Sequence, residues 1–214
     1  YYDSNDDSVN RVEKVKISGI SPRNAEQAFA IHSLLNEKVS LVSINGVAGT
    51  GKTLLALAGA ISQRRNYKQI FVARPIVPLS NKDVGYLPGE IHSKINTYMK
   101  PIWDNFKYIQ NQYKETSKEF KVLKNMVDSE KLLIQPLAYI RGRSFSNIFF
   151  IVDEAQNLTP HEIKTIISRA GENTKIVFAG DINQIDTPYL DSQSNGLSYL
   201  IDKLKGQKLY SHVT

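Results

Sequence analysis

A glycine-rich octapeptide, GVAGTGKT, occupies residues 46–53 and has the spacing G-x-x-x-x-G-K-[ST]. In such a loop, backbone N–H groups surround a phosphate at the start of a helix, where the helix dipole also favours an anion. Lys52 is then expected to reach the β- and γ-phosphates, and the Thr53 hydroxyl to bind Mg²⁺. The residues predicted to bind the nucleotide are Gly46, Val47, Ala48, Gly49, Thr50, Gly51, Lys52, Thr53 and Leu54.

Two adjacent carboxylates, Asp153 and Glu154, directly follow the apolar run IFFIV at residues 148–152. A strand that is apolar at consecutive positions is buried on both faces, and its carboxyl end lies at the edge where open α/β sheets bind ligands. We expect Asp153 to hold the Mg²⁺ shell and Glu154 to orient or deprotonate the attacking water. The alternative is a pair that only caps a helix, and the phosphate loop upstream disfavours it.

A third polar segment, GDINQ at residues 180–184, follows the apolar residues 175–179. A neutral amide at the same sheet edge can contact a γ-phosphate without competing with the metal, and it loses that contact when the phosphate leaves. Gln184 is therefore a candidate catalytic residue and nucleotide-state sensor. The alternative is a polar loop residue that is hydrogen-bonded only to its neighbours.

Short apolar segments predict the strands that position these residues, at 41–44, 69–73, 132–135, 148–152, 175–179 and 208–213. Helical patterns separate them, and one helix is expected to start at Ser21-Pro22. Strands that alternate with helices predict an α/β fold with a mostly parallel sheet covered on both faces. Polar residues end strand 175–179 as well as strand 148–152, which favours placing strand 175–179 between the phosphate-loop strand and the Asp153 strand. With the phosphate-loop strand counted as strand 1, the predicted strand order is 5-1-4-3-2.

Two segments interrupt this alternation. Residues 74–89 contain Pro75, Pro78 and Pro88, which predicts a long functional loop. The segment of about residues 90–130 has helical spacing with interleaved lysines, and it is expected to be a helical insert. Its aromatic residues could stack on nucleic-acid bases, but their core-like periodicity favours burial.

Composition excludes several classes of protein. The chain has 214 residues, 41% hydrophobic and 22% charged, which is typical of a globular domain rather than a disordered or collagen-like chain. It has no cysteine, which excludes a disulfide framework and a thiolate site and favours a reducing compartment, so a cytoplasmic location is expected. No apolar run approaches the ~20 residues of a membrane helix, so no membrane association is expected. The net charge of +6 is compatible with a polyanionic partner or with a lysine-rich solvated face.

These motifs, with several shorter ones, resemble the PhoH family of ATPases in order and over nearly the whole chain. The shorter ones are Arg74-Pro75, YLPG at 86–89, RGRS at 141–144 and the extension of the carboxylate pair to DEAQN at 153–157. That family resembles the first motor domain of superfamily 1 helicases, which implies a RecA-like P-loop NTPase fold. The segment NAEQAFA at 24–30 is similar to the Q motif of those helicases and implies that Gln27 reads the adenine edge. The alternative for Gln27 is an ordinary solvated residue.

The segments GISPRN at 19–24 and TPHE at 159–162 resemble PhoH domains fused behind an N-terminal PIN nuclease domain. This resemblance implies that residues 1–18 are a linker remnant or a frayed terminus, and that residues 19–214 are the ATPase domain with its C-terminal end truncated. It also implies RNA unwinding coupled to RNA cleavage in the full-length protein. No PIN carboxylate cluster occurs in this sequence, so we assign no nuclease activity to it.

The expected function is ATP hydrolysis with Mg²⁺ that drives binding or unwinding of single-stranded RNA or DNA. The nucleic-acid candidates are Arg74, Lys82, Arg141 and Arg143, which would contact phosphates without reading sequence. A neighbouring subunit of a homo-oligomeric ring, with a hexamer as the expected assembly, is expected to supply a catalytic arginine in trans. The candidates are Arg141, Arg143 and Arg169, whose alternative role is a surface salt bridge. Two alternatives remain open: an ATP-gated binding module without translocation, and a small-molecule kinase with a lid in the helical insert.

Overall fold

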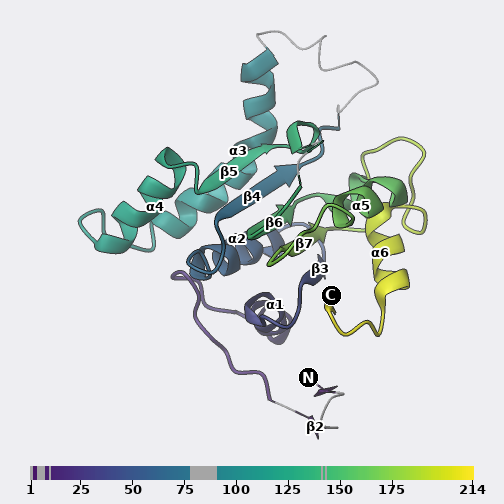
Figure 1. Cartoon of the computed structure of the whole chain (residues 1–214), viewed down its shortest axis with the longest axis horizontal. Coiled ribbons are helices and arrows are strands. Elements are labelled where there is room, and N and C mark those ends of the chain that lie inside the picture. The colour runs from purple at the N-terminus through teal and green to yellow at the C-terminus, as the bar shows by residue number, and fades with distance from the viewer. Residues whose placement is uncertain (1, 4–7, 10, 78–90, 141, 143) are drawn as a thin grey trace.

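A computed structural model of the chain describes residues 2–3, 8–9, 11–77, 91–140, 142 and 144–214 (Figure 1). Its centre is a six-stranded sheet in which all neighbouring strands are parallel. The strands, in their spatial order, are β5 (Leu132–Pro136), β4 (Gln69–Arg74), β6 (Ile148–Val152), β7 (Lys175–Gly180), β3 (Leu41–Asn45) and β8 (Tyr210–Val213). Two short strands, β1 (Tyr2–Asp3) and β2 (Ser8–Val9), form a separate antiparallel pair.

The predicted fold class and strand order are confirmed. Counted from the phosphate-loop strand and without β5, the strands β8, β3, β7, β6 and β4 lie in the order 5-1-4-3-2, and β5 extends the sheet beyond β4. Strand β7 pairs with β3 on one side and with β6 on the other. Because these strands are parallel and adjacent, the three polar segments that follow them meet at one edge of the sheet.

The helices cover both faces of the sheet (Figure 1). Helices α1 (Ala25–Leu35), α2 (Lys52–Ser62), α3 (Ile91–Gln110) and α4 (Lys118–Asp128) share one apolar core with the sheet face that carries Val42, Val72 and Val177. Helices α5 (Pro160–Ile167) and α6 (Gly196–Leu204) pack on the face that carries Phe150 and Phe178. Two short 3₁₀ helices, η2 (Leu137–Ile140) and η3 (Ala155–Asn157), follow β5 and β6.

Side-chain caps determine where most of these helices begin. Asn24, Ser117, Thr159 and Asn195 each accept a hydrogen bond from a backbone N–H of the first turn. The prediction that the first helix starts at Ser21-Pro22 is wrong, because the Asn24 cap starts α1 at Ala25. Helix α2 differs, since its N-cap is Gly51 and no side chain caps it. Its first N–H groups are therefore not used by a protein side chain.

A buried lysine joins the sheet to the end of α1. The Lys175 side chain is 2% exposed, and its ammonium donates to the carbonyls of Leu34 at 2.7 Å, Asn36 at 2.8 Å and Ser33 at 3.3 Å. These groups include carbonyls that a helix leaves unpaired at its C-terminus. Burial lowers the pKa of Lys175 to about 8.

In the described part of the chain, no helix has both the length and the apolar character that a membrane crossing needs.

Candidate functional site: a nucleotide cleft at the carboxyl edge of the sheet

The phosphate loop connects β3 to α2 and has the backbone shape that its glycines predict. Gly49 and Gly51 have φ angles of 82° and 87°, a region in which a side chain causes strain. The loop is fixed internally by a hydrogen bond of 2.8 Å from the Thr50 hydroxyl to the Val47 carbonyl. It is attached to the neighbouring strand β7 by a hydrogen bond of 3.2 Å from the Gly46 N–H to the Gly180 carbonyl. The uncapped N-terminus of α2 therefore faces a preformed loop, which is the arrangement that binds phosphate.

Lys52 is the first residue of α2, and its ammonium lies over the loop. It donates to the carbonyls of Gly46 at 2.6 Å and Val47 at 2.9 Å. An ammonium has three donors, so a phosphate oxygen can take the third or can displace one of these carbonyls. Lys52 is thus placed where the sequence motif requires it.

Thr53 and Asp153 meet although β3 and β6 are not neighbours in the sheet. The Thr53 hydroxyl donates to Oδ1 of Asp153 at 2.6 Å. Asp153 is 4% exposed, and burial raises its pKa to about 6, an effect that the bond from Thr53 and the nearby Arg74 charge partly offset. A cation beside this carboxylate would favour its charged form. The two oxygens together are the ligands that Mg²⁺ prefers, so this pair fits the predicted metal site.

Glu154 is held by two long side chains. Its Oε1 accepts a hydrogen bond of 3.0 Å from Arg74 at the end of β4, and its Oε2 accepts one of 2.6 Å from Gln156. Its backbone has a φ angle of 53°, which is uncommon for a residue with a side chain and occurs at functional sites. Both oxygens are oriented while lone pairs remain free, because a carboxylate accepts about four hydrogen bonds.

Gln156 connects the carboxylate pair to the segment after β7. Its amide nitrogen also donates to the Gln184 carbonyl at 2.9 Å, and its Oε1 accepts from the Asp181 N–H at 3.1 Å. Gln156 is fully buried, and Gly180 allows this approach because a Cβ there would lie 2.3 Å from Oε1. Gln184 lies beside Glu154 in the cleft as a result.

Two cavities meet at this edge. One cavity, of about 200 Å³, is lined by the part of the loop that leads into α2, by both carboxylates and by Gln184. The other, of about 340 Å³, extends from the loop past α1 to the end of β8. Lys52 and Asp181 line both. The predicted nucleotide-binding residues line one or both cavities: Gly46, Val47, Ala48, Gly49, Thr50, Gly51, Lys52, Thr53 and Leu54.

Gln27 lies in the larger cavity, on the first turn of α1. Its amide nitrogen donates to the Thr50 carbonyl at 3.0 Å, and its Oε1 accepts from the Arg23 N–H at 2.8 Å. An amide that is fixed against the phosphate loop presents a rigid polar edge beside the apolar side chains of Ala30 and Leu55. The larger cavity therefore combines a fixed side-chain amide with an apolar wall.

The predicted nucleic-acid residues are placed differently. Arg74 pairs with Glu154, which lines the smaller cavity. Arg169, which was predicted as a candidate for the arginine supplied in trans, lines neither cavity of the cleft, and its guanidinium donates to the Ile140 carbonyl at 3.2 Å. Lys82, Arg141 and Arg143 lie outside the described residues.

Sequence reasoning missed two residues that line the cleft, Asp181 and Asn105, and one buried residue behind it, Gln156. Gln156 belongs to the DEAQN segment, but its role depends on contacts with the segment after β7. Asp181 lines both cavities, and the GDINQ segment was a usable signal for it. Asn105 reaches the smaller cavity from α3, and no local pattern marks it.

The chain matches the family described as PhoH-like protein over residues 19–214. It is 48% identical over 200 residues to Protein PhoH2 of Bacillus subtilis (strain 168), an alignment that covers 92% of the chain and 44% of that protein. It is 35% identical over 216 residues to Protein PhoH2 of Mycolicibacterium smegmatis, with 96% and 47% covered. It is also 35% identical over 164 residues to the PhoH-like protein of Bacillus subtilis, with 75% and 48% covered. The chain thus spans about half the length of these curated relatives. With this match and a phosphate loop on a parallel α/β sheet, the chain belongs to the PhoH family of P-loop ATPase domains.

Proposed function

We propose that the chain binds ATP with Mg²⁺ and hydrolyses it, and that hydrolysis is coupled to binding or unwinding of single-stranded RNA or DNA. The observation that carries the proposal is the hydrogen bond between Thr53 and Asp153, which joins the phosphate loop to the strand that ends in Glu154. Thr53 and Asp153 line one cavity of about 200 Å³ with Lys52 and Glu154, which supports a shared site for the proposed metal, phosphate and base.

Thr53 and Asp153 are the residues that would hold Mg²⁺, which when bound neutralises charge on the phosphate oxygens. The described residues contain no group of three His, Asp or Glu side chains that could hold a metal alone. Phosphate oxygens and water would supply the remaining ligands of the proposed Mg²⁺.

Glu154 serves as the group that orients the attacking water and accepts its proton. Arg74 and Gln156 hold its two oxygens, and this lowers the entropic cost of placing the carboxylate. Gln156 also holds the backbone of Gln184, so Gln184 is positioned to respond to the γ-phosphate beside the same carboxylate.

Adenine recognition is assigned to the larger cavity. Gln27 would present its amide to the base edge, and its bond to the Thr50 carbonyl would connect base recognition to the phosphate loop. The ATP-to-GTP affinity ratio, measured by competition against a fluorescent nucleotide, tests this role, because a Gln27→Ala variant would lose the preference for ATP.

The nucleic acid would follow the segment that begins at Arg74. The contact of Arg74 with Glu154 supports this path, because it brings the start of the segment to the proposed catalytic base. Lys82, Arg141 and Arg143 are the further proposed contacts. An arginine of a neighbouring subunit in a homo-oligomeric ring is proposed for the γ-phosphate, and sedimentation with an ATP analogue tests it.

Phosphate release with and without single strands tests the function. Hydrolysis stimulated by strands, with stimulation that falls steeply as salt increases, supports the proposed coupling. Unstimulated hydrolysis would instead support the ATP-gated binding module, and a phosphorylated small-molecule acceptor would support the kinase. Absence of hydrolysis with every strand would overturn the proposal.

A further inference from the structure

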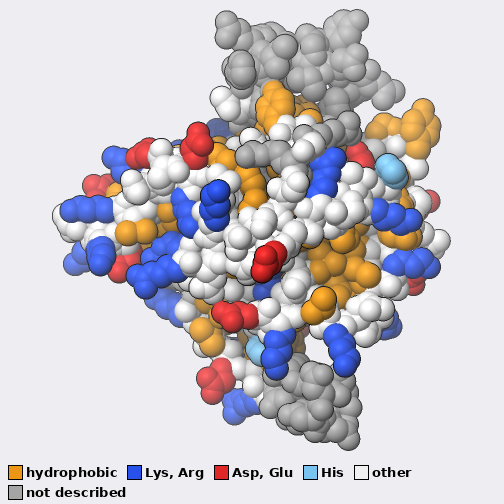
Figure 2. Space-filling view, in the orientation of Figure 1, with side chains coloured by type: hydrophobic (Ala, Val, Ile, Leu, Met, Phe, Trp, Pro, Cys, Tyr) orange, Lys and Arg blue, Asp and Glu red, His pale blue; other side chains and the backbone are white. Residues whose placement is uncertain are grey.

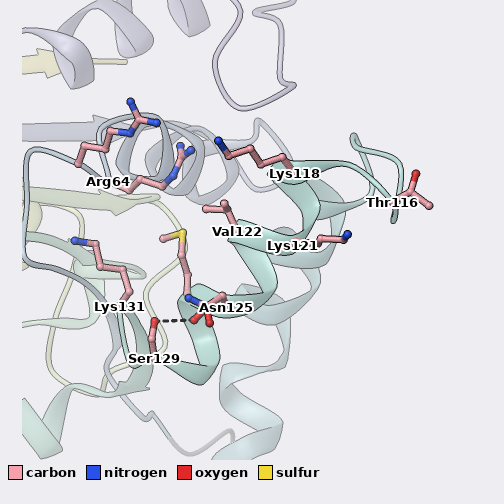
Figure 3. A pocket seen from close by; sticks show the side chains of 10 residues that line it. Arg64, Thr116, Lys118, Lys121, Val122, Asn125, Ser129 and Lys131 are labelled. Carbon is pink, nitrogen blue, oxygen red and sulfur yellow. Dashed lines mark hydrogen bonds between the residues drawn. The ribbon is translucent and has the colours of Figure 1, made fainter.

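A second, larger hollow lies at the opposite edge of the sheet from the nucleotide cleft. It has a volume of about 760 Å³ and lies between α4, the end of α2 and the start of β5 (Figure 3). We call it the basic groove. The described residues that line it are Arg64, Arg65, Thr116, Lys118, Lys121, Val122, Asn125, Met126, Ser129 and Lys131.

The position of the basic groove follows from the topology. Lys131 directly precedes β5, and Arg64 and Arg65 lie between α2 and β4, so all three are at the amino ends of their strands. The phosphate loop follows the carboxyl end of β3, and all strands of the sheet are parallel. Nucleotide and groove ligand therefore do not compete for the same residues.

The charge of the basic groove is one-sided. Five of its described lining residues are Lys or Arg, and none of the described lining residues is acidic. Figure 2 shows several Lys and Arg side chains on the α4 flank, on the left of the view, with acidic side chains among them outside the groove lining. Five cations that line one hollow repel one another, so an anionic ligand would be stabilised there.

The cations are distributed along two walls. Arg64 and Lys131 belong to one wall, and Lys118 extends from α4 toward it with Val122 between the walls (Figure 3). Lys118, Lys121 and Asn125 recur at helical spacing on one face of α4. A single small anion could contact few of these groups at once. A chain of regularly spaced phosphates can contact cations on both walls.

Hydrogen bonds to backbone carbonyls hold two cations of the basic groove, Lys131 and Arg64, in place. The Lys131 ammonium donates to the Tyr67 carbonyl and, at 2.8 Å, to the Lys68 carbonyl, and the Arg64 guanidinium donates to the Ile61 carbonyl at 3.1 Å. The Ser129 hydroxyl donates to the Asn125 carbonyl at 2.6 Å, at the C-terminal end of α4 (Figure 3). Donors remain on both cations, because an ammonium has three and a guanidinium five.

We propose that the basic groove binds the phosphodiester backbone of a single-stranded nucleic acid, at the sheet edge opposite the nucleotide cleft. The proposal rests on the proposed nucleic-acid function for the choice of polymer, and it adds a binding face that is separate from the segment beginning at Arg74. The groove would contact phosphates and would not stack on bases, since no described lining residue is aromatic.

Helix α2 connects the two sites. It begins with Lys52 in the phosphate loop and ends at Ser62, two residues before Arg64 in the groove. At ~1.5 Å per residue, its 11 residues extend roughly 16 Å. The strand and the nucleotide would thus contact opposite ends of one buried helix.

The test measures fluorescence anisotropy of labelled oligo(U) and oligo(dT) with the purified chain, without nucleotide and at several salt concentrations. The groove variant carries Arg65→Gln, Lys118→Gln and Lys121→Gln, all at exposed positions. The control variant carries Lys203→Gln, Lys205→Gln and Lys208→Gln, which removes the same charge from exposed positions at α6 and after it. Circular dichroism and binding of an ATP analogue check that the cleft of each variant is intact.

We expect the groove variant to lose at least about tenfold in affinity for both strands, with the log–log salt slope reduced by about 2 for three lost phosphate contacts. The control variant is expected to stay within about twofold of the unmodified chain at the same salt. Equal losses in the two variants would show a net-charge effect and overturn the groove. Retained strand affinity in the groove variant with lost binding of a polyglutamate peptide would assign the groove to an acidic protein segment, which also overturns it. Phosphate release by the unmodified chain is measured separately, so failure of the groove is distinguishable from failure of the ATPase.

Discussion

The Thr53 hydroxyl and the Asp153 carboxylate are 2.6 Å apart although 100 residues separate them in the chain. The contact joins the start of α2 to the end of β6, across the intervening end of β7. Because the carboxylate is buried, this bond also satisfies a group that would otherwise be costly to desolvate. The same two oxygens are the candidate Mg²⁺ ligands.

Removal of the Thr53 hydroxyl should weaken nucleotide binding only when Mg²⁺ is present. We expect Thr53→Ala to lower the affinity for Mg-ATP by about tenfold, a loss of about 1.4 kcal/mol, because an oxygen ligand is missing. Thr53→Ser keeps the hydroxyl and is the matched control. Calorimetric titrations with Mg²⁺ and with EDTA measure the difference. A loss of the same size in EDTA would argue against a metal role.

Neutralising Glu154 should separate binding from chemistry. Glu154→Gln keeps the size of the side chain but removes the proton acceptor, so kcat for ATP hydrolysis is expected to fall at least ~10²-fold with the ATP affinity nearly unchanged. Glu172→Gln changes an exposed carboxylate and should leave kcat unaltered. Phosphate release and analogue titration measure both quantities. Turnover at the normal rate in Glu154→Gln would remove this residue from the mechanism.

Gln156 should act as a positioning residue. Gln156→Ala removes its bonds to Glu154, Asp181 and Gln184, so kcat is expected to fall while the ATP affinity stays close to normal. The free energy of unfolding should also fall, by about 1–3 kcal/mol, because buried groups lose their partners. The exposed Gln193→Ala is the control.

Gly180→Ala offers an independent route to the same effect. A Cβ at this position would lie 2.3 Å from Oε1 of Gln156, so the amide must move although Gln156 itself is unchanged. The variant should therefore reproduce the low kcat of Gln156→Ala in the same phosphate-release assay. Normal turnover in both variants would show that Glu154 does not depend on this amide.

The buried Lys175 should leave a signature in the pH dependence of stability. Its pKa in the folded chain is about 8, below the usual 10.5, so between these pH values the unfolded chain binds more protons than the folded one. The free energy of unfolding therefore rises with pH across this window through Lys175. Urea unfolding of the unmodified chain and of Lys175→Met should show a difference, unmodified minus variant, that grows from about pH 8 to about pH 10.

The control for this effect is Lys205→Met at an exposed position. Its difference from the unmodified chain should remain flat over the same pH range, because the Lys205 side chain is exposed in the folded chain as well as in the unfolded one. A difference for Lys175→Met that is flat or that falls with rising pH would contradict the depressed pKa.

Local pattern was sufficient for the strands of the sheet and for the phosphate loop and the carboxylate pair at its carboxyl edge. Consecutive apolar residues before Asp153 predicted a buried strand, and the spacing of Gly46, Gly51 and Lys52 predicted a phosphate loop between a strand and a helix. The start of the first helix was missed, since Ser21 and Asn24 are both good caps and the sequence pattern does not choose between them.

What the residue order established about this protein is therefore its fold class, the order of five of the six parallel strands and the set of polar groups that follow the central strands. Periodicity and motif spacing are local properties, and the polar strand ends indicated which strands are neighbours. Folding alone determined that Arg74 and Gln156 hold Glu154, and that Arg64, Lys118 and Lys131 face one groove. These contacts join segments far apart in the chain. They depend on strand register and helix packing, which no stretch of sequence specifies on its own.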